Sequence, residues 1–337
     1  MIDALRPSQQ DSASPIRRRL VPPAVMLVFS LVAPFTLADT EYYAILTLAA
    51  IFGIVAVSLD LLLGYAGLLS LGQTVPFGVA AYTSAVLTST HGLRPELAAV
   101  AAVMAAIAVA VVASPILRLE GFYFALATLG LVLIFEAVSR NWLSVTGGSS
   151  GFVGIEPLTL GPLTLRSATA NFLLAWLCLT AVTLVAVNVT RSRFGRGMLA
   201  IHEDPRAASA LGVSVSSVKI RIWIFAAGVS GVAGVIYCHY LRFLSPEQFG
   251  QTPAIVLVAA IVIGGTGTVY GPVVGVVVVR LLPALFDGFQ ERSVLVYGAA
   301  IILFTVLWPR GLVGAATDVV KRIRSARAAR SAGRSVP

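Results

Sequence analysis

Ionisable residues within apolar stretches are the first candidates for chemistry, because a charge at the centre of a membrane-spanning helix costs about 2.5–3.5 kcal/mol. Few occur in this sequence. Asp60 ends an apolar run just before Gly64, and we expect it to be either an interface-level residue or a hydrogen-bonding partner inside a helix bundle. Glu136 and Arg140 lie four positions apart, so they share one helix face and can form an ion pair that fixes the depth of the helix.

Two glycine-interrupted segments could expose backbone groups to a small solute. Residues 64–90 and 252–286 are apolar, but each contains several glycines and at least one proline, so neither fits one continuous helix. We expect a break followed by a helix near 75–90 in the first, and helices over 252–264 and 268–286 in the second. Interrupted helices often mark a translocation path, whereas glycine can also serve close helix contact alone. The candidate path residues are Asp60, Gly64, Tyr65, Gly67, Ser70, Gln73, Gly264, Gly265, Thr266, Gly267 and Tyr270.

A polar loop over residues 191–220 separates two apolar segments and contains a short predicted helix. Asp204 and Pro205 are suited to cap and begin this helix, and Gly212 is suited to end it. The small residues between them would leave room to sit in a groove on a partner. The alternative is an ordinary helix at the membrane surface.

Sequence motifs for catalysis are missing. Both lysines, Lys219 and Lys321, follow valine, so the chain has no phosphate-binding Gly-Lys-Ser/Thr motif. The two cysteines, Cys178 and Cys238, lie in apolar runs and are expected to be packed thiols, and the three histidines are scattered. We therefore predict no catalytic residues, no metal ligands and no bound cofactor, which makes a membrane enzyme the least favoured class.

The elements that position these residues are predicted to be membrane helices. The chain has 337 residues, of which 58% are hydrophobic and 12% charged, whereas about a quarter of an ordinary soluble sequence is charged. A span needs about 20 apolar residues. We predict an all-α, polytopic bundle of about ten transmembrane helices, two regions of which are broken by glycine. Besides the interrupted regions, the expected spans are 21–38, 43–63, 97–117, 122–139, 171–190, 221–241 and 293–308.

The basic residues predict the orientation. Threading ten spans through the membrane places the basic clusters at 17–19, 191–196 and the C-terminal tail on one side, which indicates cytoplasmic termini. This pattern explains the net charge of +9 without nucleic acid. Arg242, Arg280 and Arg292 are exceptions. An uncleaved first helix is favoured over a signal peptide because no clear cleavage site follows. The expected regions are a cytoplasmic tail at 1–20, a transmembrane domain at 21–310 with an external loop at 140–170, and a basic cytoplasmic tail at 311–337.

Five blocks, in order along the chain, resemble the branched-chain amino-acid permease family of ATP-binding-cassette importers. They are LLLGYAGLLSLGQTVPFGVAAYT at 61–83, GFYFALATLG at 121–130, NWLSVTGGSSGFVGI at 141–155, GRGMLAIHEDPRAASALGVSVSSVK at 195–219 and GGTGTVYGPVVG at 264–275. The fourth block also resembles the Glu-Ala-Ala loop of import permeases, with Arg206 where that loop often has Glu. Asp60 stands where relatives commonly carry Asn, and the tail at 308–312 lacks a polar residue often found there.

The resemblance implies an integral permease subunit in a bacterial inner membrane. Its implied partners are membrane lipid, a second related permease, two cytoplasmic ATPase subunits that bind ATP and Mg, and a periplasmic solute-binding protein. The 140–170 loop is either a docking site for an external partner or only a long connection. The helix at 203–212 would be the coupling helix that seats on the ATPase. The implied coupling residues are Glu203, Asp204, Pro205, Arg206, Ala207, Ala208 and Gly212.

The substrate is left open by the sequence. Branched-chain or other apolar amino acids are the default, and urea, short amides and aromatic or other carboxylates are alternatives within the same importer type. A stand-alone secondary carrier or channel is a further alternative, but such carriers usually need buried carboxylates near the middle of the membrane, in which this sequence is poor.

Overall fold

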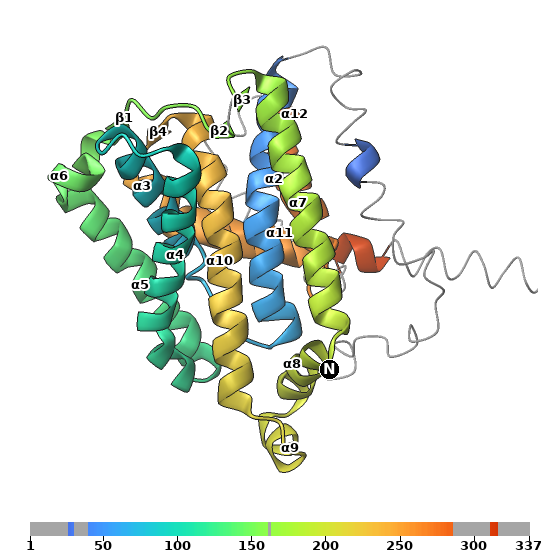
Figure 1. Cartoon of the computed structure of the whole chain (residues 1–337). Coiled ribbons are helices and arrows are strands. Elements are labelled where there is room, and N and C mark those ends of the chain that lie inside the picture. The colour runs from blue at the N-terminus through green and yellow to red at the C-terminus, as the bar shows by residue number, and fades with distance from the viewer. Residues whose placement is uncertain (1–25, 30–39, 161–162, 286–310, 316–337) are drawn as a thin grey trace, which may run out of the picture.

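A computed structural model describes residues 26–29, 40–160, 163–285 and 311–315, and the structural statements below refer to these residues (Figure 1). They form a bundle of helices linked by turns and by one longer segment between Asn141 and Ala168. The long helices are α2 (Thr40–Asp60), α3 (Thr74–Ser89), α4 (Pro95–Val112), α5 (Gly121–Asn141), α7 (Ala168–Arg191), α10 (Val215–Leu241), α11 (Gln251–Gly264) and α12 (Gly271–Leu285). The shorter elements are η3 (Leu61–Tyr65), η4 (Ser114–Arg118), α6 (Leu143–Thr146), η5 (Gly148–Ser150), α8 (Arg193–Glu203), α9 (Pro205–Ala210) and η6 (Pro246–Phe249).

Six helical segments in the described part of the chain are long and apolar enough to cross a membrane. They are Tyr42–Tyr65, Pro95–Val112, Gly121–Asn141, Ala168–Arg191, Val215–Leu241 and Pro246–Gly264. The expected helices near 75–90 and 268–286 are present as the shorter α3 and α12. The expected spans 21–38 and 293–308 lie outside the described residues, apart from 26–29. A multi-pass bundle is therefore confirmed, but the count of about ten spans is not.

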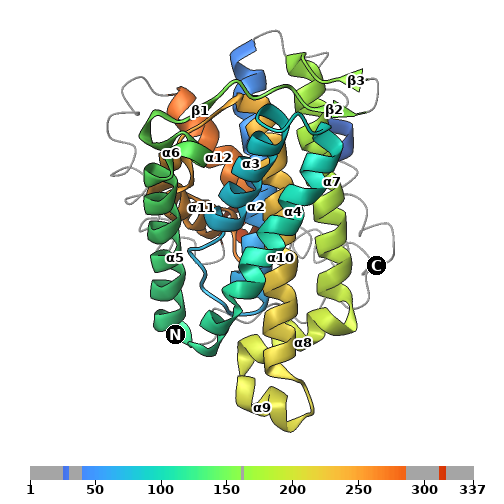
Figure 2. The same cartoon turned by 60° about the vertical axis from the view of Figure 1, so that its left-hand side comes forward.

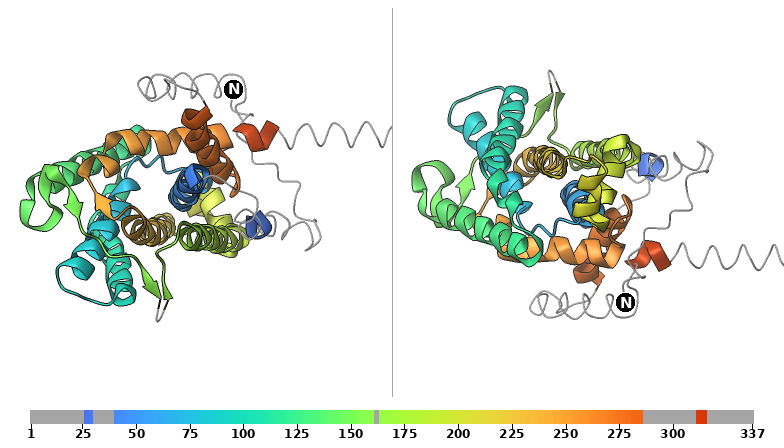
Figure 3. Two further views of the ribbon diagram at one scale, coloured as in Figure 1. Left: turned by 90° about the horizontal axis from the view of Figure 1, so that it is seen from above. Right: turned by 90° about the horizontal axis from the view of Figure 1, so that it is seen from below.

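Helix α2 lies at the centre of the bundle. Seen end-on, it is surrounded by α7, α10, α11 and α12, and it contacts each of them (Figure 3). A helix that is apolar on all sides is suited to such a buried position. Helix α4 lies further out, and its contact face is a stripe of alanines at every fourth position, Ala98, Ala102, Ala106 and Ala110. These small side chains allow close approach of α3 and α10.

The prediction for the fourth span was too long at its C-terminal end. The sequence pattern extended that span to residue 117, whereas α4 ends at Val112 and a separate 3-10 turn, η4, covers Ser114–Arg118. Pro115 lies in the first turn of η4. Proline lacks the backbone N–H that a continuing α-helix requires, so it breaks the helix at this point.

The 140–170 loop is more structured than the all-α prediction allowed. Strand β1 (Phe152–Val153) pairs antiparallel with β4 (Phe243–Leu244), and β2 (Thr159–Leu160) forms a hairpin with β3 (Leu163–Thr164). His239, buried in α10, places Nδ1 2.7 Å from the Glu156 carbonyl oxygen and Nε2 2.9 Å from Ser84 Oγ. Because a carbonyl only accepts, Nδ1 carries the hydrogen and Ser84 donates to Nε2. This loop is thus fastened to its own bundle.

The expected pair between Glu136 and Arg140 is confirmed at 2.8 Å. Arg140 also lies 3.3 Å from Glu247, which belongs to η6. The arginine therefore connects α5 to the segment that precedes α11, rather than only bracing its own helix. Both contacts lie at the end of the bundle that carries the 140–170 loop.

Candidate functional site

The two glycine-broken segments, predicted separately, meet in the structure. After α2, the chain forms the π-helical turn η3. Residues 66–73 then form no helix, and α3 begins at Thr74. The turn between α11 and α12 lies against η3, with Gly265 and Gly267 at positive φ angles of 115° and 70°. A Cβ atom at Gly64 would overlap the backbone of Gly267. We call this contact region, residues 60–67 with 264–271, the glycine junction.

Asp60 joins the two segments of the glycine junction through a buried hydrogen bond. Its side chain is 1% exposed, and its Oδ1 accepts a hydrogen bond of 2.9 Å from the Gly267 backbone N–H. Its Oδ2 has no hydrogen-bond partner among the described residues. Of the two expectations for Asp60, the structure thus matches the hydrogen-bonding partner within the bundle rather than the interface-level residue. A buried carboxyl group is costly unless hydrogen-bonded, so this contact constrains how the two breaks can separate.

Gln73 and Ser70 are enclosed by the protein. Gln73 is 2% exposed, and its Oε1 accepts from Ser230 Oγ of α10 at 2.9 Å. Ser230 Oγ also lies 2.8 Å from Ser58 Oγ of α2. Ser70 is buried, and its Oγ accepts from the Gly72 N–H at 3.1 Å. In this conformation both predicted path residues serve contacts within the chain.

The remaining predicted path residues differ in accessibility. Gly67 and Thr266 are exposed, Tyr65 and Tyr270 are half-buried, and Gly264 and Gly265 are buried. The buried glycines meet the close-contact expectation. A Cβ at Gly264 would overlap the Gly271 carbonyl, and a Cβ at Gly311 would overlap the backbone of Gly265.

The polar loop forms two helices, α8 and α9, at the same end of the bundle as the glycine junction. Figures 1 and 2 show α9 projecting beyond the ends of the other helices. The predicted cap is present, because Asp204 Oδ1 accepts from the N–H groups of Arg206 and Ala207 at 2.8 and 3.2 Å. Gly212 follows at a φ of 84°, as a helix-ending glycine requires. The preceding helix α8, with Met198 and Ile201 buried, was not predicted.

The exposure of the predicted coupling residues, which run from the end of α8 through α9, differs in part from the sequence prediction. Glu203, Asp204, Pro205, Arg206 and Ala207 are exposed, but Ala208 is buried against its own chain. Leu211, which sequence reasoning missed, is 84% exposed at the projecting tip. An apolar side chain that protrudes from a polar loop is a better anchor for a protein partner than a buried alanine.

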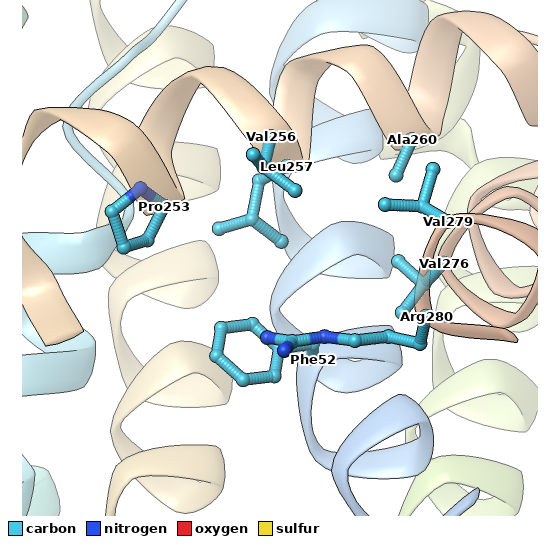
Figure 4. Close-up of a pocket in the computed structure, with 8 residues that line it drawn as sticks. All are labelled: Phe52, Pro253, Val256, Leu257, Ala260, Val276, Val279 and Arg280. Carbon is cyan, nitrogen blue, oxygen red and sulfur yellow. The ribbon is translucent and has the colours of Figure 1, made fainter. Parts of the chain in front are cut away.

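A small pocket between α2, α11 and α12 contains the arginine that the span prediction had left unexplained (Figure 4). Arg280 lies over the Phe52 ring, with its guanidinium carbon 3.9 Å from the ring centre. The other lining residues are apolar: Pro253, Val256, Leu257, Ala260, Val276 and Val279. A cation–π contact of this kind compensates part of the cost of holding an arginine within an apolar helix.

Comparison with known proteins gives one family. Residues 42–305 match the family described as branched-chain amino acid transport system / permease component. The high-affinity branched-chain amino acid transport system permease protein LivM of Escherichia coli K12 is 30% identical over 312 residues, covering 86% of this chain and 73% of LivM. The autoinducer 2 import system permease protein LsrC of Yersinia pseudotuberculosis YPIII is 26% identical, covering 81% of each chain. No solved structure matches.

Proposed function

Because this chain belongs to the family of branched-chain amino acid transport permease components, we propose that it lines the translocation path of an ATP-driven importer for branched-chain or other apolar amino acids. It is a multi-pass membrane permease subunit of an ATP-binding-cassette type of transporter rather than an enzyme. The observation that carries the proposal is the position of α8 and α9, which project from the bundle end that holds the glycine junction.

The subunit works with partners that supply energy and substrate. Two cytoplasmic ATPase subunits bind ATP and Mg, a second related permease completes the path, and a periplasmic binding protein delivers the solute. The bundle end with α9 faces the cytoplasm of a bacterial inner membrane, and both termini lie on that side. Arg118, Arg191 and Arg196 lie at this end, which supports the orientation because basic residues are enriched on the cytoplasmic side.

The projecting position of α9 suits it to couple ATP hydrolysis in the ATPase subunits to movement of the permease. Helix α9 sits in a groove on an ATPase subunit, with Leu211 as the apolar anchor and Arg206 at the rim. Closure of the two ATPase subunits on ATP displaces α9 and shifts the permease between inward-open and outward-open states. Such a displacement is effective only if it favours one state over the other. The glycine junction is where the path would open, because there the helices are already interrupted.

A second candidate substrate class comes from the relatives. LsrC is named for autoinducer 2 import and is similar over most of its length, so an importer for another small polar solute is the alternative. Urea, short amides and aromatic or other carboxylates belong to the same alternative. Screening the ligands of the binding protein that co-purifies with the chain distinguishes these classes.

The docking role of α9 is tested by Leu211→Arg. Loss of an interface anchor costs about 2 kcal/mol or more, roughly 30-fold in affinity, so ATPase subunits should no longer co-purify with the tagged variant. Leu93→Arg is the matched control, because Leu93 is 38% exposed in the turn between α3 and α4, away from α9. Equal ATPase recovery with both variants would show that α9 is not the docking element.

A further inference from the structure

A histidine in α8 joins the projecting helices to the glycine junction. His202 lies in the last turn of α8, two residues before the Asp204 cap of α9. Its Nδ1 is 3.1 Å from the Gly64 carbonyl oxygen. Since the carbonyl can only accept, Nδ1 carries the hydrogen and donates it. The contact joins residues that are 138 positions apart.

The imidazole ring is also held by shape. Gly67 has a φ of 69° and lies beneath the ring, and a Cβ at Gly67 would be 3.2 Å from His202 Cδ2. That spacing is tighter than ordinary van der Waals contact, and an L-residue is strained at this φ. Glycine at position 67 therefore allows the backbone conformation of the turn after η3 and leaves the space that the His202 ring occupies.

The residue that His202 contacts is part of the junction itself. Gly64 lies against Gly267, whose N–H is bound by Asp60. A displacement of His202 thus acts on the carbonyl of a residue in direct contact with the second broken segment. Helix α8 is suited to carry that displacement, because Met198 and Ile201 hold one of its faces against the bundle while α9 projects from its end.

We propose that His202 is a positioning residue that transmits the movement of α9 to the glycine junction, through its hydrogen bond to Gly64. The inference rests on the proposed function, since it requires that α9 be moved by ATPase subunits. It goes beyond that function by naming the contact through which the movement reaches the path. His202 does not touch the solute and takes no part in ATP hydrolysis.

His202→Leu removes the hydrogen bond while retaining a side chain of moderate size. Because His202 is exposed, its replacement opens no cavity in the core. In the reconstituted complex of this chain, its partner permease, the ATPases and the binding protein, we expect the ATPase subunits to remain bound. Solute uptake and the stimulation of ATP hydrolysis by loaded binding protein should both fall by about fivefold or more, which is the lower range for coupling between distant sites.

Two further variants separate coupling from general damage. His202→Asn keeps an N–H donor close to the position of Nδ1, so it should restore most of the uptake. Gly67→Ala displaces the ring and should reproduce the loss seen with His202→Leu, and combining the two changes should add little. The matched control is His91→Leu, since His91 is another exposed histidine, whose Nδ1 lies 3.4 Å from the Val86 carbonyl of the adjacent α3.

Each result of this experiment decides a separate point. Normal uptake with His202→Leu overturns the inference and leaves the importer intact. Loss of ATPase binding by His202→Leu also overturns it, because the residue would then serve docking. No rescue by His202→Asn contradicts the hydrogen bond as the means of transmission. Failure of the unaltered chain to recover any ATPase subunit would remove the proposed function and this inference with it.

Discussion

Asp60 Oδ1 accepts a 2.9 Å hydrogen bond from the backbone N–H of Gly267, which lies 207 positions further along the chain. This contact joins the end of the central helix α2 to the turn between α11 and α12. It places a carboxyl group at the point where two interrupted helices touch.

Asp60→Asn should retain uptake. The asparagine side-chain oxygen can accept from Gly267 as Asp60 Oδ1 does, so the contact that joins the two broken segments is kept. Asp60→Leu, in contrast, leaves the Gly267 N–H without an acceptor, which costs about 1–3 kcal/mol. Thermal unfolding in detergent and uptake assays on the same preparations check both expectations. A loss of transport in a stable Asp60→Asn protein would mean that the carboxyl group itself is needed.

Gly64→Ala should abolish uptake without preventing insertion into the membrane. The added Cβ would overlap the backbone of Gly267, so the junction must be forced apart. Gly130→Ala is the matched control, because Gly130 is also in a helix and a Cβ there meets nothing within 4 Å. Uptake normalised to the amount of protein in the membrane measures the effect. Equal uptake by the two variants would show that close contact at Gly64 is dispensable.

Gln73→Ala and Ser230→Ala remove the same hydrogen bond from opposite sides. Each should lower stability by about 1 kcal/mol or somewhat more, as expected for an internal hydrogen bond. If Gln73 also contacts the solute in another state of the transport cycle, only Gln73→Ala should raise KM for uptake. A similar KM for both variants would limit Gln73 to its structural role.

Thr266→Ala, at an exposed position of the junction, tests the path from the other broken segment.

Arg140→Ala should leave uptake unchanged. The arginine is exposed and pairs with Glu136 and Glu247 at the end of the bundle away from α9. Exposed ion pairs contribute little to stability and are weakened further by salt. Uptake measured at low and at high salt checks this expectation. A marked, salt-dependent loss of uptake would instead indicate that the Arg140 region receives a charged partner from outside.

The local features of the site could be predicted from the sequence. Glycine clusters with a proline indicate interrupted helices because these residues disfavour continuous helix, and both breaks are present. Asp204, Pro205 and Gly212 predicted the bounds of α9 because capping depends on neighbouring residues. The pair at Glu136 and Arg140 follows from helical spacing alone.

Relationships between distant segments could not be predicted in this way. Periodicity along one segment does not say which other segment lies beside it, so the contact of Gly64 with Gly267 and the partner of Gln73 appear only in the folded chain. The same holds for exposure. Ala208 and Leu211 lie three residues apart in one loop, yet one is buried and the other projects outward, because α9 contacts α8 and α10 while its tip extends beyond them.

The central claim is that this chain transports only when driven by ATPase partners. Its most direct test is uptake of radiolabelled leucine, isoleucine or valine into proteoliposomes that contain the tagged chain, either alone or with the permease, ATPase and binding-protein partners with which it co-purifies. Uptake is predicted only for the full complex, only with ATP and Mg, and without need of an ion gradient. Uptake by the chain alone, driven by a proton or sodium gradient, would contradict the account and identify a secondary carrier.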